Sequence, residues 1–336
     1  MTAVPTKPVT AAPAERKRTA KAHAASKEKT YRKRTNLKPL LTLDNPDARI
    51  YIGDCREIIP SIPECAAQKV DLVFADPPFN WSVPYDHWHD GMPRSDYLDF
   101  TYAWLKACAD SLAPHGAMWV NIPDDTAAEI VVYLKRIGLH MVNWCVWHYR
   151  FGQNNKARFI NSKVHALYFA KQDDAKKRIW NPQRVLEMSD RASTYGDKRT
   201  LDKKDGMPAG MRVPMDVWYG PNWGRIQGNN KERRPRHHNQ LPEVYLERVI
   251  EACSNPGDLV MDPFLGSGTT GVVAHDLKRR FIGCEFSVQN AKSAFERMDK
   301  IGAINLGKTR GMSSAIAPKR NRLKGFDAEK SLKSAD

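Results

Sequence analysis

Two short apolar stretches that each end in an Asp-Pro dipeptide constrain the fold of this 336-residue chain more than any other feature. Residues 70–75 run directly into Asp76 and Pro77, and residues 259–261 run into Asp262 and Pro263. Short apolar runs bounded by turn residues are typical of buried strands. The same patterns predict further strands at 117–121, 141–147, 164–170 and 281–285, and helices at 96–112, 123–136, 242–252, 269–278 and 287–300. Strands that alternate with helices predict an α/β fold whose parallel or mixed sheet is covered on both faces.

The stretch 171–240 shows no helical or strand periodicity of apolar residues and is rich in Gly, Pro, Asn and Arg, so we expect an inserted, loop-rich region. Between the two basic tails, which carry +9 (1–40) and +5 (305–336) of the net charge of +15, residues 150–240 carry +11, while 41–149 carry −8 and 241–304 carry −2. A local basic excess suits a polyanionic partner such as nucleic acid, although a solvated lysine-rich surface has the same composition.

Both ends of the chain are basic and contain few large apolar residues, which predicts disordered tails at 1–40 and 305–336. No apolar run approaches the roughly 18 residues of a membrane span, and no signal-peptide core follows the start. The six cysteines are far apart and form no CxxC pair, so we expect no disulfide framework, no metal site and a cytoplasmic location.

The second Asp-Pro turn leads into a glycine-rich loop that opens a predicted helix, an arrangement suited to binding a ligand at the helix N-terminus. Gly266, Gly268 and Gly271 match the GxGxxG pattern of dinucleotide-binding proteins. Glu285 ends the next strand, 23 residues after Asp262, where an acidic side chain can bind ribose hydroxyls. The glycine-rich loop and Glu285 are therefore also compatible with a nicotinamide or flavin cofactor. A phosphate-binding P-loop is excluded, because no Gly-Lys-Ser/Thr follows.

The first Asp-Pro turn, Asp76-Pro77-Pro78-Phe79, provides a carboxylate, a constrained backbone carbonyl and an aromatic ring within four residues. These groups suit a planar amine, whose N–H groups need acceptors and whose ring can stack on Phe79. An ordinary turn at the end of a strand would have the same sequence.

Taken together, the two turns resemble those of the DNA amino-methyltransferases that use S-adenosylmethionine. The order of Asp-Pro-Pro-Phe, basic insert and glycine loop resembles their circularly permuted beta group, and most closely the cell-cycle-type adenine methyltransferases. The resemblance covers roughly 48–302 and includes Ile52-Gly53-Asp54-Cys55, a His-x-x-Gln-x-Pro stretch from His237, and the segment 158–170.

The resemblance implies a Rossmann-like methyltransferase sheet and a residue-by-residue site. It assigns Asp76, Pro77, Pro78 and Phe79 to catalysis, with Asp76 and the Pro77 carbonyl accepting hydrogen bonds from the target amine and Phe79 stacking on the base. It assigns the cofactor adenine to Asp54, the ribose to Glu285, and the methionine part to Asp262, Phe264, Gly266 and Gly268. Further cofactor-binding residues are Cys55, Thr269, and His237 and Gln240 in the lead-in to the cofactor helix. Two positions depart from the family pattern, Phe79 in place of Tyr and His238 in place of Pro.

The resemblance also predicts five segments. These are a disordered basic tail (1–40), the catalytic half of the methyltransferase domain (41–170), a target-recognition region (171–240), the cofactor-binding half (241–304) and a basic tail (305–336). Arginines that could contact guanine edges or phosphates in the recognition region are Arg178, Arg184, Arg191, Arg199, Arg212, Arg225, Arg233, Arg234 and Arg236. Trp218, Tyr219 and Trp223 fit either a small core or stacking platforms.

The resemblance implies methyl transfer to N6 of an adenine flipped out of double-stranded DNA, in a prokaryotic or phage cytoplasm. Asp76 favours adenine, because cytosine-N4 enzymes of this family more often carry Ser before Pro-Pro. Alternatives are a cytosine-N4 enzyme, an RNA or protein-amide methyltransferase, for which Asn before Pro-Pro is more usual, and a catalytically silent DNA-binding protein. Cytosine C5 methylation is excluded because no cysteine follows a proline. A homodimer and a cognate restriction endonuclease are further expectations from the resemblance.

Overall fold

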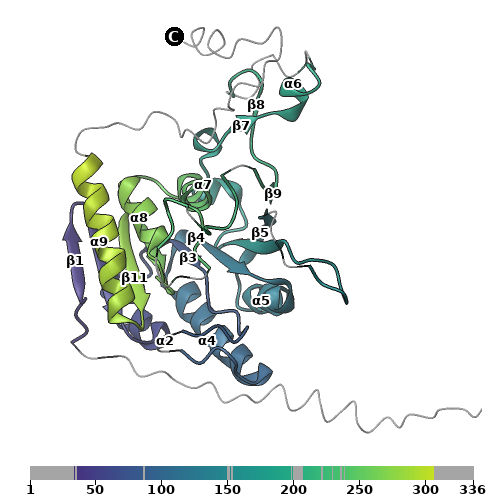
Figure 1. Cartoon of the computed structure of the whole chain (residues 1–336). Helices are drawn as coiled ribbons and strands as arrows, with labels where there is room; N and C mark the ends of the chain where they lie inside the picture. Colours follow the sequence, from purple (N-terminus) through teal and green to yellow (C-terminus); the bar gives the residue numbers. More distant parts are fainter. Residues whose placement is uncertain are drawn as a thin grey trace, which may run out of the picture. The chain divides into compact units, whose positions relative to one another are not determined.

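A computed structural model gives the fold (Figure 1). It describes residues 34, 36–85, 88–149, 152, 154–197, 199, 207–220, 222–228, 230–234, 237 and 239–305, the last five without their side chains. Most of both predicted tails, 1–33 and 306–336, lies outside these ranges, as do Arg236 and His238.

A nine-stranded mixed sheet runs through the described part of the chain, in the order β1-β2-β11-β10-β3-β4-β6-β5-β9. Its strands are β1 (Leu41–Asp44), β2 (Asp47–Ile52), β3 (Val70–Ala75), β4 (Leu112–Ile122), β5 (His140–His148), β6 (Lys163–Ala170), β9 (Val217–Trp218), β10 (Leu259–Asp262) and β11 (Arg280–Glu285). The five strands from β2 to β4 in this order are parallel, and β6 runs antiparallel to both β4 and β5. The two Asp-Pro turns therefore follow neighbouring parallel strands, β3 and β10.

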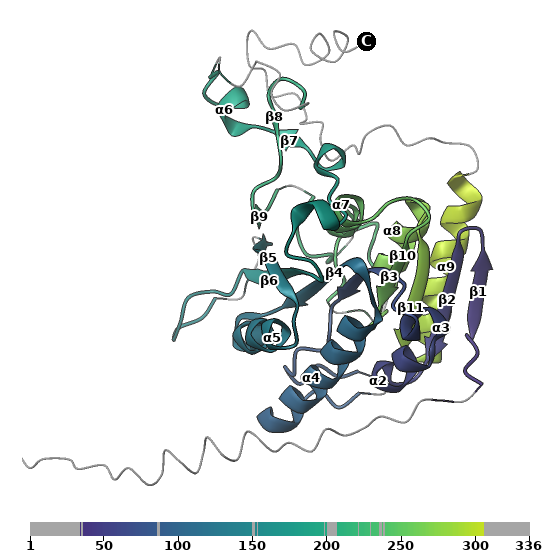
Figure 2. The ribbon, with the colours of Figure 1, turned by 180° about the vertical axis from the view of Figure 1, so that it is seen from behind.

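Helices cover both faces of this sheet (Figure 2). One group consists of α2 (Cys55–Ile58), η1 (Ile59–Ser61), α3 (Pro63–Ala66), α4 (Arg94–Ser111) and α5 (Asp124–Arg136), and the other of α7 (Glu243–Cys253), α8 (Thr269–Asp276) and α9 (Val288–Asn305). Alternate residues of β3 belong to two separate apolar clusters, Leu72 and Phe74 to the one with α7 and α8, and Val73 and Ala75 to the one with α4. This alternation follows from the twofold period of a strand and shows that β3 is buried on both faces.

The predicted α/β fold is confirmed, and every predicted helix and strand is present within a few residues of its expected bounds. One strand begins earlier than predicted: the strand expected at 117–121 already starts at Leu112. Helix α4 ends at Ser111, and β4 begins at Leu112, because Leu112 pairs with Val70 before the register shifts. Strands β1 and β2 were not expected from the sequence pattern.

The stretch 171–240 contains short elements, in keeping with its lack of a sequence period. They are η2 (Ala175–Lys177), η3 (Pro182–Arg184), β7 (Glu187–Met188), α6 (Asp190–Ser193), β8 (Met211–Arg212) and β9. Strands β7 and β8 form a separate ladder, whereas β9 pairs with β5 of the main sheet. Trp218 and Trp223 are buried in the main core against Tyr245, so the core interpretation of these two residues is correct, while Tyr219 is half exposed. None of the helices in the described ranges is long and apolar enough to cross a membrane.

Candidate active site

A cavity of about 200 Å³ opens at the carboxyl ends of β3, β10 and β11. Helix α8 follows β10 on one side of the sheet and α4 follows β3 on the other, so the chain switches sides between these neighbouring strands. Such a switch point is where open α/β sheets bind their ligands. The predicted site residues that line the cavity are Cys55, Asp76, Pro77, Pro78, Phe79, His237, Gln240, Asp262, Phe264, Gly266, Thr269 and Glu285.

Three carboxyl groups face this cavity, at Asp76, Asp262 and Glu285. Burial raises the pKa of Asp76 to about 7, and the nearby Asp262 charge acts in the same direction. Burial also raises the pKa of Asp262 to about 7, and it raises the pKa of Glu285 above its ordinary value. Clustered carboxylates that are removed from water raise one another's pKa, so this cavity favours a ligand that brings positive charge.

Backbone N–H groups of the glycine-rich loop hold two of these carboxylates in place. Gly266 N donates to Glu285 Oε2 at 2.9 Å, and Phe264 N donates to Asp262 Oδ1 at 2.9 Å. Ser287 N donates to the other Glu285 oxygen at 3.0 Å. Asn290 Nδ2 also reaches Glu285 Oε1, at 3.5 Å, so of the about four lone-pair sites of this carboxylate the capacity left for a ligand is mainly on Oε2.

Gly268 allows helix α8 to begin where it does. Its φ of +76° lies in the left-handed region, and a Cβ at this position would lie 2.4 Å from Cβ of Ala294 in α9. Glycine avoids both the backbone strain and the clash. Gly268 itself does not line the cavity, so it acts by letting the loop approach α9 rather than by contacting a ligand.

A row of aromatic rings forms another wall of the cavity. Trp88 stacks on Phe286 with ring centroids 5.8 Å apart and packs on Phe100 at 4.5 Å, and Phe100 packs on the predicted Phe264 at 6.2 Å. All four residues line the cavity. The sequence reasoning missed Trp88, Phe100 and Phe286, although an aromatic residue directly after Glu285 is a visible signal.

Asp76 is held by a hydrogen-bonded chain that the sequence reasoning also missed. Asn121 Nδ2, at the end of β4, donates to Asp76 Oδ1 at 2.6 Å, and this bond partly offsets the rise in the pKa of Asp76. Tyr245 Oη, on α7, donates to Asn121 Oδ1 at 3.2 Å. Asn121 and Tyr245 are 1% and 0% exposed. The tyrosine thus fixes the amide so that its NH₂ group faces Asp76 and its oxygen does not.

The segment around Phe79 is shaped by bonds to its neighbours. Tyr97 Oη donates to the Pro78 carbonyl at 2.8 Å, and the Asp90 carboxylate accepts from the backbone N–H groups of Asn80, Trp81 and Val83. The Phe79 ring is 6% exposed and lies edge-on to Trp81.

A second, smaller cavity lies beside the first and shares Asp76 and Phe79 with it. Its other walls include Asn121, Trp147, Val164 and Arg225. The Arg225 guanidinium lies 4.2 Å from the ring centroid of Tyr149, and its charge lowers the pKa of Asp76.

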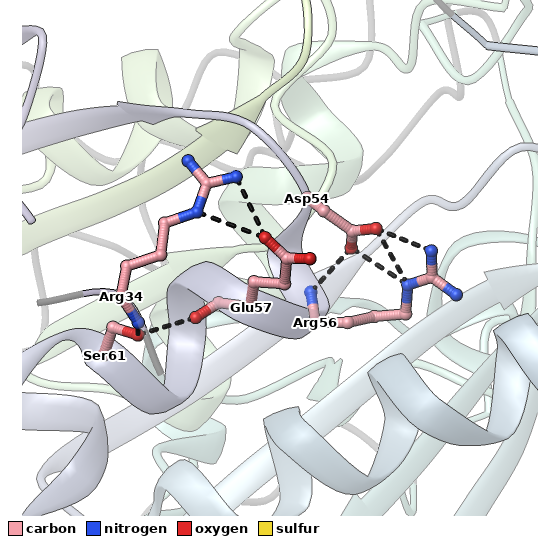
Figure 3. A network of polar contacts seen from close by, with 5 residues as sticks. All are labelled: Arg34, Asp54, Arg56, Glu57 and Ser61. Atoms are coloured by element: carbon pink, nitrogen blue, oxygen red, sulfur yellow. Dashed lines mark hydrogen bonds and ion pairs between the residues drawn. The ribbon is translucent and has the colours of Figure 1, made fainter. Parts of the chain in front are cut away.

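Asp54 is placed differently from the other predicted cofactor residues, because Gly53 and Cys55 line the cavity and Asp54 does not. Its carboxylate caps α2 by accepting from Arg56 N at 2.9 Å and forms an ion pair with the Arg56 side chain at 2.6 Å (Figure 3). A separate ion pair joins Glu57 of the same helix to Arg34, which precedes β1 in the chain (Figure 3).

Comparisons with known proteins agree on one family. The family model described as a DNA methylase (N6_N4_Mtase) matches residues 70–296. The type II methyltransferase M1.MboII of Moraxella bovis is 30% identical over 73% of this chain and 94% of its own length. The DNA adenine methyltransferase YhdJ of Escherichia coli K12 is 29% identical over 85% of this chain and 95% of its own length. Among solved structures, the PvuII cytosine-N4-specific DNA methyltransferase has a similar fold, with a TM-score of 0.59 at 19% identity over 81% of this chain and 95% of its own.

Proposed function

Because the chain belongs to the DNA methylase family of N6-adenine and N4-cytosine enzymes, we propose that it methylates N6 of adenine at a specific site in double-stranded DNA. DNA methyltransferase activity with S-adenosylmethionine as methyl donor is the property of the family. The choice of adenine and the roles of individual residues are our proposals.

The cavity suits this cofactor by its charge and its walls. Asp76, Asp262 and Glu285 contribute carboxylates, and its lining in the described part of the chain contains no lysine or arginine. S-adenosylmethionine supplies a methyl group activated by a positively charged sulfonium and also carries an ammonium group. The aromatic row of Trp88, Phe100 and Phe286 fits a planar ring system. Glu285 would accept from ribose hydroxyls through its remaining lone pairs.

The residues of the glycine loop would then hold the methionine part of the cofactor. Asp262 offers a carboxylate at the end of β10, and Gly266, Thr269 and Phe264 line the cavity around it. Cys55, His237 and Gln240 line the same cavity. The adenine-binding role of Asp54 requires that its carboxylate serve the cofactor while it remains paired with Arg56.

Asp76 would act on the target amine. The amine is a poor nucleophile because its lone pair is delocalised into the base. Asn121 occupies Asp76 Oδ1, which leaves Oδ2 and the Pro77 carbonyl to accept the two N–H bonds. These two fixed acceptors draw the amine nitrogen toward tetrahedral geometry as it attacks the methyl group of the cofactor. The rate acceleration then comes from orientation and electrostatics. Phe79 would stack on the base and offset part of the cost of flipping it.

The single observation that carries the choice of adenine is the carboxylate of Asp76 in Asp-Pro-Pro-Phe. Fold similarity does not separate the bases, since the compared relatives include an enzyme named for adenine and one named for cytosine N4. The strand order also supports the permuted arrangement, because β10, which carries the glycine loop late in the chain, lies beside β3 at the centre of the sheet.

The test is nucleoside mass spectrometry of plasmid DNA from cells that express the full chain, with Asp76→Ala as the control. We expect N6-methyladenine with the wild-type chain and only background with the variant. N4-methylcytosine would overturn the base assignment. Absence of both modified bases, with folded and expressed protein, would overturn the DNA substrate in favour of RNA, a protein amide or a silent binding protein.

A homodimer and a cognate restriction endonuclease are further proposals, and they rest on type II methyltransferases among the relatives. Gel filtration of the full chain tests the first. Challenge of the methylated plasmid with endonucleases of known site identifies, by protection, the specificity that a cognate endonuclease would have to share.

A further inference from the structure

The hairpin that joins β5 to β6 ends in a side chain with almost no protein contacts. Phe159 is 97% exposed, the highest value among the large apolar residues that the structure describes, and its neighbour Ile160 is 46% exposed. Figure 1 shows the connection as a long teal loop that leaves β5 and projects beyond the sheet. None of the proposed catalytic residues belongs to this hairpin.

The tip is held in this shape by local interactions. The side-chain oxygen of Asn155 accepts from Ala157 N at 2.8 Å and from Arg158 N at 3.2 Å, which makes a tight turn just before Phe159. Across the hairpin, a Cβ on Gly152 would lie 2.1 Å from Ile160 Cγ2, so Ile160 packs against the opposite arm. Since Ile160 turns inward, Phe159 is left to point outward.

The base of the hairpin is fixed to the candidate active site. Tyr149 N donates to the Ser162 carbonyl at 3.0 Å, and His148 pairs with Lys163 in the β5–β6 ladder. The next residue, Val164, lines the smaller cavity together with Asp76 and Phe79. Phe159 lies five positions before Val164, so the aromatic tip is within about 17 Å of that cavity along the chain.

The charge around the tip selects the partner. Residues 154–163 contain three basic side chains and no acidic one. Lys163 pairs with Asp124 of α5, so the positive charge offered to a partner comes from Lys156 and Arg158. A basic loop attracts a polyanion, and an apolar ring at its end cannot hydrogen-bond to phosphate. Proteins that distort DNA combine these two features, with basic residues on the backbone and an apolar side chain inserted between base steps.

Building on the proposed function, we propose that this hairpin enters the target duplex and that Phe159 stacks in the space left by the flipped base. Lys156 and Arg158 would contact the flanking phosphates. The extruded base would be received at the mouth of the main cavity, beside Asp76 and Phe79. Phe159 is then a positioning residue that stabilises the opened duplex and does not touch the reacting atoms.

The experiment compares paired and unpaired targets, using the full chain and oligonucleotide duplexes that carry the site mapped by sequencing of methylated plasmid. One duplex is fully paired, and the other has an abasic site opposite the target base. For Phe159→Ala, we expect methylation of the paired duplex to fall by about tenfold, the range expected for loss of one stacked base. Methylation of the unpaired target should change by less than about threefold, because the cost of opening is already removed.

Two further measurements separate this role from a structural one. A 2-aminopurine at the target position should brighten when wild type binds and brighten less with Phe159→Ala. Phe159→Trp should restore the wild-type ratio. The matched control is Val132→Ala, an exposed apolar position on α5 that is 67% exposed, and it should leave the ratio unchanged.

Each other outcome overturns the inference. Equal losses on paired and unpaired duplexes would make Phe159 a general contact to DNA, and wild-type rates on both would give it no role. A change in oligomeric state with an unchanged ratio would assign the tip to contact with a second copy of the chain. If wild type itself methylates neither duplex, the proposed function fails, and that result is distinct from a failure of the hairpin variant.

Discussion

Replacing Asn121 with alanine tests whether the Asn121 amide keeps the Asp76 carboxylate ionised. The Asn121 amide donates to Asp76 Oδ1 at 2.6 Å inside the cavity, and burial already places the pKa of this carboxyl at about 7. A hydrogen bond to a charged group contributes about 1.5–3 kcal/mol, and about 1.4 kcal/mol corresponds to one pH unit in a pKa. Removal of the bond should therefore raise the pKa of Asp76 further, because its ionisation becomes about 10- to 100-fold less favourable.

The sign of the rate effect follows from which form of Asp76 accepts hydrogen bonds best. The ionised carboxylate is the better acceptor for the target amine, so a higher pKa reduces the active fraction at neutral pH. At pH 7, the ionised fraction should fall from about one half to between about one tenth and one hundredth, so the rate falls by about 5- to 50-fold. Near pH 9, the variant should recover to within about twofold of wild type.

The assay is transfer of radiolabelled methyl groups to plasmid DNA under single-turnover conditions between pH 6 and 9.5. Ser111→Ala serves as the matched control, because it removes a buried hydroxyl bonded to a helix carbonyl on α4 and should leave the profile unchanged. Tyr245→Phe should shift the profile in the same direction by a smaller amount, because the Asn121 amide then loses only its orienting partner. An equal loss of rate at every pH would refute the reasoning and reduce Asn121 to a packing residue.

The remaining predictions concern charge, backbone and stacking in the same site. The raised pKa of Asp262 means that the folded, ligand-free protein binds a proton there that the unfolded chain has lost, so this group's contribution to stability declines as pH rises from about 4 through about 7. Asp262→Asn should therefore raise the melting temperature of the ligand-free protein at pH 8 relative to wild type, while weakening S-adenosylmethionine binding measured by calorimetry. Binding of S-adenosylmethionine to wild type near pH 7 should release protons, seen as a binding enthalpy that depends on the ionisation enthalpy of the buffer, and the Asp262→Asn variant should release fewer. Gly268→Ala should lower the free energy of unfolding in urea more than the control Gly138→Ala, because both glycines have positive φ but only the first would clash, with Ala294. Phe79→Tyr should keep DNA methylation within about threefold of wild type, and Phe79→Ala should lose about tenfold or more, since one aromatic–base stack contributes about 1–3 kcal/mol.

The sequence pattern alone predicted much of the architecture. Strands β3, β10 and β11 and helices α5, α7 and α8 lie within two residues of their expected ends, because each is encoded by a local period or an apolar run with turn residues beside it. The parallel arrangement of β3 and β10 also brings Asp76 and Asp262 to one cavity, as expected for two turns that follow parallel strands. The pattern missed β1 and β2. It also began β4 at 117 and not at Leu112, because the pairing of Leu112 with Val70 extends the strand through Pro114 and Gly116, residues typical of turns.

Other features depend on contacts that no local pattern encodes. Asn121 reaches Asp76 across 45 positions of sequence, and Tyr245 reaches Asn121 across 124. The sequence contains both residues, but their meeting requires β4 to lie beside β3 and α7 to pack across the sheet. The burial of Trp218 and Trp223 likewise follows from the pairing of β9 with β5, which connects a period-free stretch to the main core.

There is a physical reason why local sequence patterns predict some of these features and only long-range contacts decide the others. The amino-acid sequence by itself determined the strands, helices and Asp-Pro turns, because hydrophobic periodicity and backbone preferences act over a few residues. It also determined the chemistry available, through Asp76, Phe79, Asp262 and Glu285. Only the tertiary structure decided which buried neighbours raise the pKa of Asp76 and which amide orients its carboxylate. It also decided that the hairpin with the exposed Phe159 starts from the cavity that Asp76 lines. Burial and long-range contacts exist only once the sheet has formed, and they set the electrostatics on which the proposed reaction depends.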